Sequence, residues 1–175
     1  PVTTVERVHI RQALGRTLAA DVVSPIDVPG HDNSAMDGWA VRFTDLAPGA
    51  PTTLARIGES FAGRPCAATV GRGQAVRIFT GGVMPQGADT VVMQERAEER
   101  GAGVVVAPGA GTKAGQNRRF AGEDVKAGDV VFHRGQAMKP AEIGMLASLG
   151  VNEVAVYRRL VVAFFSTGDE LVSIG

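Results

Sequence analysis

The amino-acid sequence predicts an α+β fold that is mainly β. Glycine accounts for 23 of the 175 residues, well above its usual share of roughly 7%, and glycine is the residue that most readily enters tight turns. Several short segments alternate apolar and polar residues, which is the period of a half-buried strand. Two segments repeat their apolar residues at helical spacing instead. We therefore expect many short strands, many turns and two short helices.

The N-terminal region is predicted to contain a strand followed by a helix. Residues 5–10 alternate in the manner of a strand. Residues 11–20 carry apolar side chains at helical spacing and are predicted to form a short amphipathic helix. Gly15 lies inside this predicted helix, where a glycine costs about 1 kcal/mol relative to alanine. Residues 21–31 are expected to be extended, because two prolines within them exclude a helix.

The middle of the chain is predicted to consist of short strands separated by turns. Strands are predicted at residues 39–44, 52–57, 74–80, 90–95, 104–107 and 129–133, and apolar and polar residues alternate in 39–44 and 74–80. A helix is predicted at residues 140–149, because Pro140 suits the first helical position and Gly150 follows as a stop signal. A further alternating strand is expected at residues 151–157.

The last apolar segment differs from the earlier strands. Residues 160–165 are apolar on both faces, like a buried parallel strand, and a polar loop at 166–170 follows them. Open α/β sheets bind ligands at such strand ends. No crossover helix follows, although a buried strand needs neighbours on both sides. We therefore expect this chain to be a piece of a longer protein that ends just after a new domain begins.

Composition argues against several classes of protein. Lys+Arg and Asp+Glu both number 18, so no net charge attracts nucleic acid or an anionic membrane, and neither is an expected partner. The longest apolar run, at 160–165, is far shorter than the roughly 20 residues of a membrane helix, and no signal-peptide pattern opens the sequence. Cys66 is the one cysteine, which excludes an internal disulfide and favours a cytoplasmic location. The three histidines have no metal-ligand spacing, so no zinc site is expected.

The richest polar cluster lies at residues 32–38, DNSAMDG, which hold two carboxylates, an amide and a hydroxyl. Asn, Asp and Ser favour turns, and the spacing of Ser34 and Asp37 resembles a capping pattern, so one interpretation is a capped turn before a strand. The other is that Asp37 meets a cation or a water at a loop tip. No lysine or arginine precedes Arg42 nearby to neutralise this carboxylate.

A second candidate is the Thr80-Gly81-Gly82 segment, which follows a predicted strand. Glycine amides and a threonine hydroxyl can together cradle an anion. The alternative is a simple turn before the next strand.

Two adjacent arginines form the third candidate. Arg118 and Arg119 lie near a glycine and could hold a phosphate or a carboxylate. Alternatively, they pair with Glu123 and Asp124, a few residues further on, as a solvated surface cluster.

Five segments, in the same order along the chain, resemble the molybdopterin molybdenumtransferase family, which includes bacterial MoeA and the E domain of gephyrin. They are ALGRTLAADVVSPIDVPGHDNSAMDGWAVR, RIFTGGVMPQGADTVVMQE, GQNRRFAGEDVKAGDVV, AEIGMLASLGVNEVAVYRR and VVAFFSTGDEL. One such segment could match by chance, whereas five in family order could not.

The resemblance implies an organisation into domains. Residues 1–25 and 137–157 would form an elongated α+β first domain, and residues 26–136 would form a β-rich domain inserted within it. Residues 158–175 would begin a truncated α/β molybdopterin-binding domain. Family members form homodimers, so a homodimer is the expected assembly.

The resemblance also implies a reaction. Members of the family insert molybdate into adenylylated molybdopterin with Mg²⁺ and release AMP, as a step of molybdenum cofactor biosynthesis. A molybdopterin adenylyltransferase would be the upstream partner. The piece alone is expected to be inactive, because later domains are missing. A gephyrin-like scaffold or a non-catalytic assembly module is the alternative.

Site residues carry over to the matching positions of this chain. The resemblance makes Asp37, Thr80 and Glu170 catalytic residues, Asp37 and Glu170 the ligands of Mg²⁺, and Ser34, Gly81, Arg119 and Asp169 cofactor-binding residues. The chain departs from the family at Phe120 and Ala121, where members often carry a longer basic run.

Overall fold

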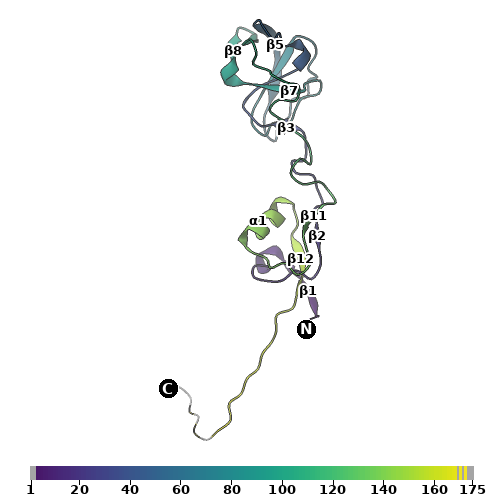
Figure 1. Cartoon of the computed structure of the whole chain (residues 1–175), viewed down its shortest axis with the longest axis vertical. Coiled ribbons are helices and arrows are strands. Elements are labelled where there is room, and N and C mark those ends of the chain that lie inside the picture. Colours follow the sequence, from purple (N-terminus) through teal and green to yellow (C-terminus); the bar gives the residue numbers. More distant parts are fainter. Residues whose placement is uncertain (1–2, 169, 171, 173–175) are drawn as a thin grey trace. The chain divides into compact units, whose positions relative to one another are not determined.

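The computed structural model describes residues 3–168, 170 and 172, and Figure 1 shows its elements. The chain forms two compact units, Pro1–Val23 with Val130–Gly175 and Ser24–Asp129. Strands predominate, and the described residues contain one α-helix, so the prediction of a mainly β, α+β fold is confirmed. None of the helices in the described part of the chain has the length and apolarity to cross a bilayer.

The two compact units meet at 23/24 and 129/130, whereas the family resemblance predicts domain limits at 25/26 and 136/137. Strand β11 (Val130–Phe132) belongs to the first unit because it pairs antiparallel with β2 (Val22–Val23). That residues 158–175 begin a third domain stays a prediction.

The first unit consists of two strand pairs and one helix around a small core. Strand β1 (Val5–His9) pairs antiparallel with β12 (Glu153–Tyr157), and α1 (Pro140–Ser148) lies between β11 and β12 in the sequence. The Lys139 N–H donates to the Glu142 carboxylate at 3.1 Å, which closes the first turn of the helix. The buried core residues come from β2, α1, β12 and the loops near them, and are Ala13, Leu18, Val22, Met138, Leu146, Val154 and Val156.

The predicted helix at residues 11–20 is wrong. Only a 3₁₀ turn, η1 (Ile10–Gln12), forms there, and Gly15 follows with φ of +71°, a left-handed conformation that ends any helix. Leu18 is fully buried, as its apolar side chain requires, but its N–H donates to the Gln136 carbonyl at 2.9 Å. Pairing with a distant segment therefore replaces the hydrogen bonds of the expected helix.

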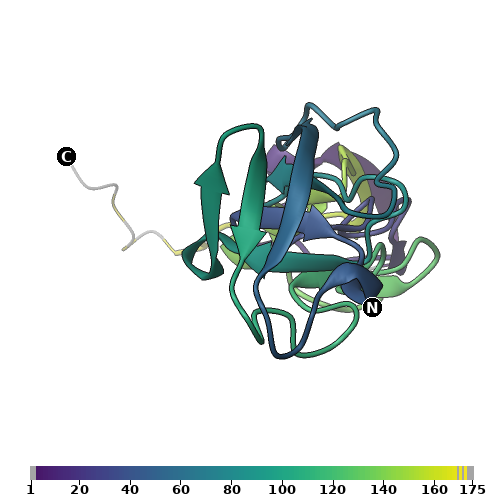
Figure 2. The same ribbon diagram turned by 90° about the horizontal axis from the view of Figure 1, so that it is seen from above.

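The second unit is built on a six-stranded sheet with the order β7-β4-β6-β5-β9-β8. Its strands are β4 (Gly38–Val41), β5 (Thr52–Ser60), β6 (Gln74–Ile78), β7 (Thr90–Met93), β8 (Ala97–Arg100) and β9 (Gly103–Val106). Strands β5 and β6 run parallel, and the other neighbours in the sheet are antiparallel. Figure 2 shows these strands from above.

Strand β4 lies inside this sheet and is buried on both faces, not half-buried as its alternation predicted. Trp39 and Val41 pack in one hydrophobic cluster, and Ala40 packs in another. The strand is also shorter than predicted, since residues Phe43–Asp45 form a 3₁₀ turn, η2. An alternating pattern is therefore compatible with two buried faces when each face has its own core.

The other strand limits differ in ways that the sheet explains. The predicted strand at 52–57 continues to Ser60 because β6 pairs beside it, and the predicted strand at 90–95 ends at Met93, where the 3₁₀ turn η3 (Gln94–Arg96) begins. Strand β8 was not predicted, because its sequence AEER lacks an apolar face. It lies at the edge of the sheet, where the backbone ladder with β9 suffices and charged side chains are common.

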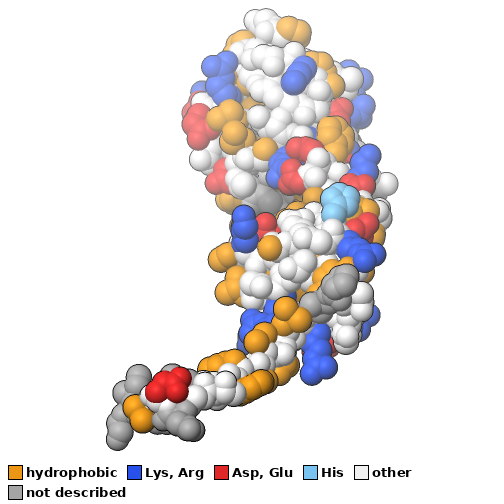
Figure 3. Space-filling model, turned by 60° about the horizontal axis from the view of Figure 1, so that its bottom comes forward, with side chains coloured by type: hydrophobic (Ala, Val, Ile, Leu, Met, Phe, Trp, Pro, Cys, Tyr) orange, Lys and Arg blue, Asp and Glu red, His pale blue; other side chains and the backbone are white. Residues whose placement is uncertain are grey.

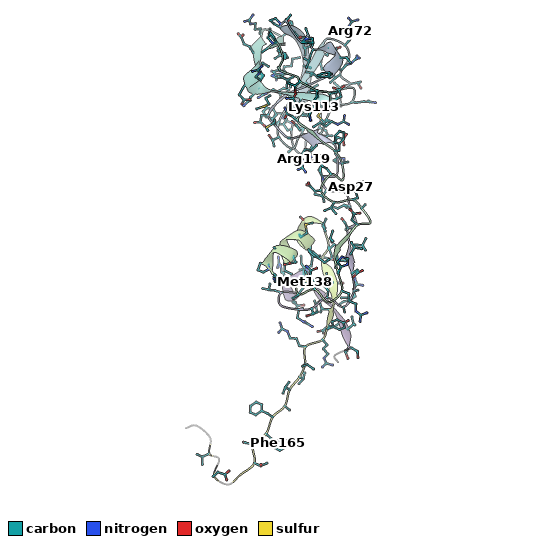
Figure 4. The ribbon with its side chains drawn as sticks, in the orientation of Figure 1. Asp27, Arg72, Lys113, Arg119, Met138 and Phe165 are labelled. Atoms are coloured by element: carbon teal, nitrogen blue, oxygen red, sulfur yellow. The ribbon has the colours of Figure 1, made fainter. Side chains whose placement is uncertain are left out.

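The predicted buried strand at residues 160–165 does not form. These residues have no regular structure, and their apolar side chains are exposed, with Leu160 at 73% and Phe165 at 89% (Figures 3 and 4). A buried strand needs hydrogen-bonding neighbours on both sides. The described residues provide none for this segment.

Candidate functional site

A two-residue strand, β3 (Asn33–Ser34), connects the candidate segments of the second unit. On one side it pairs antiparallel with β10 (Arg118–Arg119). On its other side, the Ser34 N–H donates to the Gly82 carbonyl at 3.0 Å, and the Gly81 N–H donates to the Ser34 carbonyl at 2.9 Å. The three polar segments that the sequence singled out therefore meet at β3.

Asp37 and Thr80 are in direct contact within this cluster. One carboxylate oxygen, Oδ1 of Asp37, accepts hydrogen bonds from the Thr80 N–H and from the Thr80 hydroxyl, both at 2.8 Å. The N–H of Thr80 and then its hydroxyl hold the pKa of Asp37 below its ordinary value, so the carboxylate is charged at neutral pH. The other oxygen, Oδ2, has no hydrogen-bond partner among the described residues. Asp37 can thus offer this oxygen to a cation or a water.

Glycines allow the close backbone contacts around Asp37. A Cβ on Gly38 would lie 2.0 Å from the Val92 carbonyl oxygen, so only glycine lets β4 approach β7 at this point. Gly81 adopts a φ of +78°, which favours glycine in the turn after β6. The positions of both glycines in the sequence thus have a structural reason.

The predicted anion cradle at residues 80–82 is not available for a ligand. The Thr80 N–H is bound to Asp37, the Gly81 N–H to Ser34 and the Gly82 N–H to the Phe79 carbonyl at 2.7 Å. All three amides are therefore used within the protein. The segment is a turn that holds Asp37, as the alternative interpretation had it.

Ser34 has an internal role in the same loop. It is 1% exposed, its hydroxyl donates to the Met36 carbonyl, and the hydroxyl oxygen accepts from the Met36 N–H at 3.2 Å. No helix follows, so the predicted resemblance to a helix cap is wrong, and the hydroxyl stabilises a turn instead. Ser34 shapes the loop that presents Asp37.

The two arginines of β10 are both paired with carboxylates. Arg119, labelled in Figure 4, contacts Glu123 at 3.2 Å and Asp124 at 2.6 Å, and Asp124 raises the pKa of its guanidinium. Arg118 forms an ion pair with Asp32. The interpretation as a surface cluster therefore describes Arg119, and any anion bound there would compete with two carboxylates.

Two residues of this site were missed by sequence reasoning. Arg77 donates to the Gly38 carbonyl at 3.0 Å and to the Gln94 side chain at 2.6 Å, and the Gln94 N–H donates to the Asp37 carbonyl at 3.1 Å. The available signal for Arg77 was a charged residue among the apolar residues of the strand β6.

The remaining predicted residues lie elsewhere. Glu170 is exposed in the C-terminal segment, which is counted with the first unit, and Asp169 lies outside the described residues. Residues Ser34, Asp37, Thr80, Gly81 and Arg119 all belong to the second unit.

The described side chains offer a limited set of metal ligands. Nowhere in residues 3–168, 170 and 172 do three or more His, Cys, Asp or Glu side chains gather as a metal site. Mg²⁺, however, usually takes one or two protein carboxylates and keeps several waters or phosphate oxygens. The Oδ2 atom of Asp37 fits one such position.

Comparison with known proteins gives a consistent result. The family model described as the MoeA N-terminal region (domain I and II) matches residues 1–150. The molybdopterin molybdenumtransferase of Haemophilus influenzae is 46% identical over 173 residues, which cover 99% of this chain and 42% of that protein. Molybdopterin molybdenumtransferase 2 of Mycobacterium tuberculosis is 42% identical over 171 residues, covering 96% of this chain and 42% of its own length.

The fold is similar as well. A crystal structure of the molybdopterin biosynthesis moeA protein from Pyrococcus horikoshii OT3 matches with a TM-score of 0.82 and 38% identity, covering 89% of this chain and 41% of that one. The chain thus spans about two fifths of the length of these relatives. The family model matches most of the residues, the relatives are more than 40% identical, and the fold is shared with a solved MoeA structure. The chain therefore belongs to the MoeA N-terminal region (domain I and II) family.

Proposed function

We propose that this chain is part of a molybdopterin molybdenumtransferase, an enzyme of molybdenum cofactor biosynthesis that inserts molybdate into adenylylated molybdopterin and releases AMP. The observation that carries this proposal is the 46% identity across 99% of the chain to a protein of that name. The gephyrin-like scaffold and the non-catalytic module are not favoured, because the transferase name recurs among the relatives.

Asp37 is the residue of the second unit to which we assign a chemical role. Its carboxylate is charged, is held by Thr80 through one oxygen, and presents the other. The Asp37 carboxylate would be one ligand of Mg²⁺, because hard cations take carboxylate oxygens. A bound Mg²⁺ would neutralise the phosphate charge of the substrate. Thr80 keeps the Asp37 carboxylate in one orientation.

Arg119 has a different proposed part. Its guanidinium would bind a substrate phosphate, and an incoming phosphate would replace Glu123 and Asp124 as its partners. Asp169, Ser34 and Gly81 complete the proposed cofactor-binding set, with the last two acting through the shape of the loop.

We also propose the setting of the enzyme. A cytoplasmic location is supported by the single cysteine, Cys66, which lies in the chain as a free thiol. A homodimer, with a molybdopterin adenylyltransferase supplying the adenylylated substrate, is supported by membership of the family.

The test is AMP release from adenylylated molybdopterin in the presence of Mg²⁺ and molybdate. Four proteins are compared: this chain, a longer chain extended past Gly175, and the longer chain carrying either Asp37→Asn or Glu98→Gln. The asparagine keeps an acceptor for Thr80 but removes the charge. Glu98→Gln is the matched control, because Glu98 is an exposed carboxylate of the same unit whose pKa is lowered by hydrogen bonding to Arg100.

We expect AMP release from the longer chain, with little change for Glu98→Gln. The loss for Asp37→Asn should be on the order of 100-fold, since even the outer-shell partners of metal ligands are worth about 10–100-fold. A silent longer chain, under conditions where a known transferase works, would refute the proposed function. Equal activity of Asp37→Asn and Glu98→Gln would refute the role of Asp37.

A further inference from the structure

We propose that Arg77 is a positioning residue that holds the Asp37–Thr80 pair in the geometry required for reaction. This inference rests on the proposed function, since it assigns Arg77 a part in the same site. Arg77 belongs to β6 and lies opposite Trp39 of β4 in the antiparallel register. It is half-buried and reaches both sides of the pair.

On the Asp37 side, Arg77 holds the Gly38 carbonyl directly and the Asp37 carbonyl through Gln94. One guanidinium nitrogen donates to the Gly38 carbonyl at 3.0 Å. Another donates to the Gln94 side-chain oxygen at 2.6 Å, and the Gln94 N–H in turn donates to the Asp37 carbonyl at 3.1 Å. The peptide groups of Asp37 and Gly38 are therefore both tied to one guanidinium.

On the Thr80 side, Arg77 acts through an aromatic ring. Its guanidinium lies 4.8 Å from the ring centroid of Phe79, the residue that precedes Thr80. The Phe79 ring stacks on Phe61, with centroids 4.5 Å apart and an interplanar angle of 11°. Arg64 covers the Phe61 ring at 4.3 Å. The Phe79 ring, next to Thr80 in the chain, is therefore in contact with both the Arg77 guanidinium and the Phe61 ring.

A buried aromatic ring also lies near the Arg77 guanidinium. The Trp39 ring, 1% exposed, lies 5.5 Å from the Arg77 guanidinium carbon. A planar guanidinium can stack on aromatic rings while its N–H groups donate in its own plane, which a lysine ammonium cannot reproduce. Arg77→Lys should therefore keep the charge but lose the simultaneous hold on Gly38, Gln94 and Phe79.

The first test measures AMP release by the longer chain. Arg77→Lys is compared with Arg56→Lys, a matched control on β5 whose guanidinium pairs with Glu59 and Glu99. We expect kcat to fall about tenfold for Arg77→Lys with KM changed less than about twofold, because the residue acts through Asp37 and not on the substrate. The control should keep both constants.

A double mutant separates positioning from a general loss of structure. If Arg77 acts through Asp37, then Arg77→Lys should reduce kcat little further in the Asp37→Asn background, because coupled residues are not additive. A full tenfold further loss in that background would overturn the proposal. So would a KM that rises while kcat is unchanged.

The second test does not depend on activity and uses the 175-residue chain. Amide hydrogen exchange of the Thr80 N–H, followed by NMR, should be about tenfold faster in Arg77→Lys, since the hydrogen bond to Asp37 is less well held. Asp37→Ala, which removes the acceptor, sets the upper limit, and Arg56→Lys should match the unmodified chain. Unchanged Thr80 exchange in Arg77→Lys would overturn the inference. A longer chain without AMP release would instead refute the proposed function, and the Thr80 amide would still decide the positioning claim.

Discussion

Replacing Gly38 with alanine tests how closely the two strands behind Asp37 approach each other. The added Cβ would lie 2.0 Å from the Val92 carbonyl oxygen and 2.9 Å from the Val92 carbonyl carbon. These atoms belong to the backbone of β7, which is paired with β4 along its whole length. Neither strand can move away without breaking ladder hydrogen bonds, so the clash should destabilise the second unit.

The size of the effect follows from the nature of the contact. Overpacking in a well-packed core usually costs about 1–3 kcal/mol, and a collision with fixed backbone belongs at the upper end. With a urea dependence of about 2 kcal/mol per molar, a loss of about 3 kcal/mol lowers the unfolding midpoint by about 1.5 M.

The assay is urea unfolding followed by tryptophan fluorescence. Trp39 is the one tryptophan in the sequence and is buried in the second unit beside Gly38, so its emission reports on this unit. Gly49→Ala is the control, because a Cβ on Gly49 would meet nothing within 4 Å. A midpoint for Gly38→Ala within about 0.3 M of that control would refute the reasoning about the close approach.

Two further predictions concern stability. Gly144 lies inside α1, where a Cβ would meet nothing within 4 Å. Gly144→Ala should therefore stabilise the first unit by about 0.5–1 kcal/mol. Thermal unfolding followed by circular dichroism measures this, and a lower melting temperature for the variant would contradict it. Asp32 has its pKa held below the ordinary 3.8 by hydrogen bonds from Arg118 and then from the Ala121 N–H. Because the folded pKa is depressed, the pair's contribution is complete above pH 3.8 and is lost as the pH falls through the lower value. The urea midpoint of Asp32→Asn should thus lie below that of the unmodified chain at about pH 6, and the difference should shrink as the pH falls below 3.8. A difference that stays constant as the pH falls would contradict the role of the ion pair.

Much of the candidate site was visible in the sequence as isolated segments. The cluster at residues 32–38, the turn at 80–82 and the two arginines were each singled out. Their contacts were not visible, because Thr80 is 43 residues from Asp37 and Ala121 is 89 residues from Asp32. The interpretation of Arg119 as part of a charged cluster depended on neighbours only four and five residues away, and the structure shows those pairs.

Secondary structure was predicted correctly where residues close in sequence determine it, and wrongly where pairing with a distant segment determines it. The helix α1 was predicted within one residue, because Pro140 and Gly150 mark its ends by their own backbone preferences. The segment at 11–20 carried the same apolar spacing, yet hydrogen bonds to a segment more than 100 residues away compete with a helix there, as in the pairing of Leu18 with Gln136. The charged strand β8 depends on the ladder with β9 and leaves no apolar pattern to detect.

By itself, the sequence determined the mainly β character of the chain, the helix α1 and the family, because each depends on residue type and order along the chain. The tertiary structure alone decided that β4 is buried on both faces, that the amides of residues 80–82 are occupied, and that Arg77 reaches both sides of the Asp37–Thr80 contact. The physical reason is that these features depend on hydrogen bonds and packing between strands distant in sequence. A side chain's own preferences do not specify its partner across a sheet.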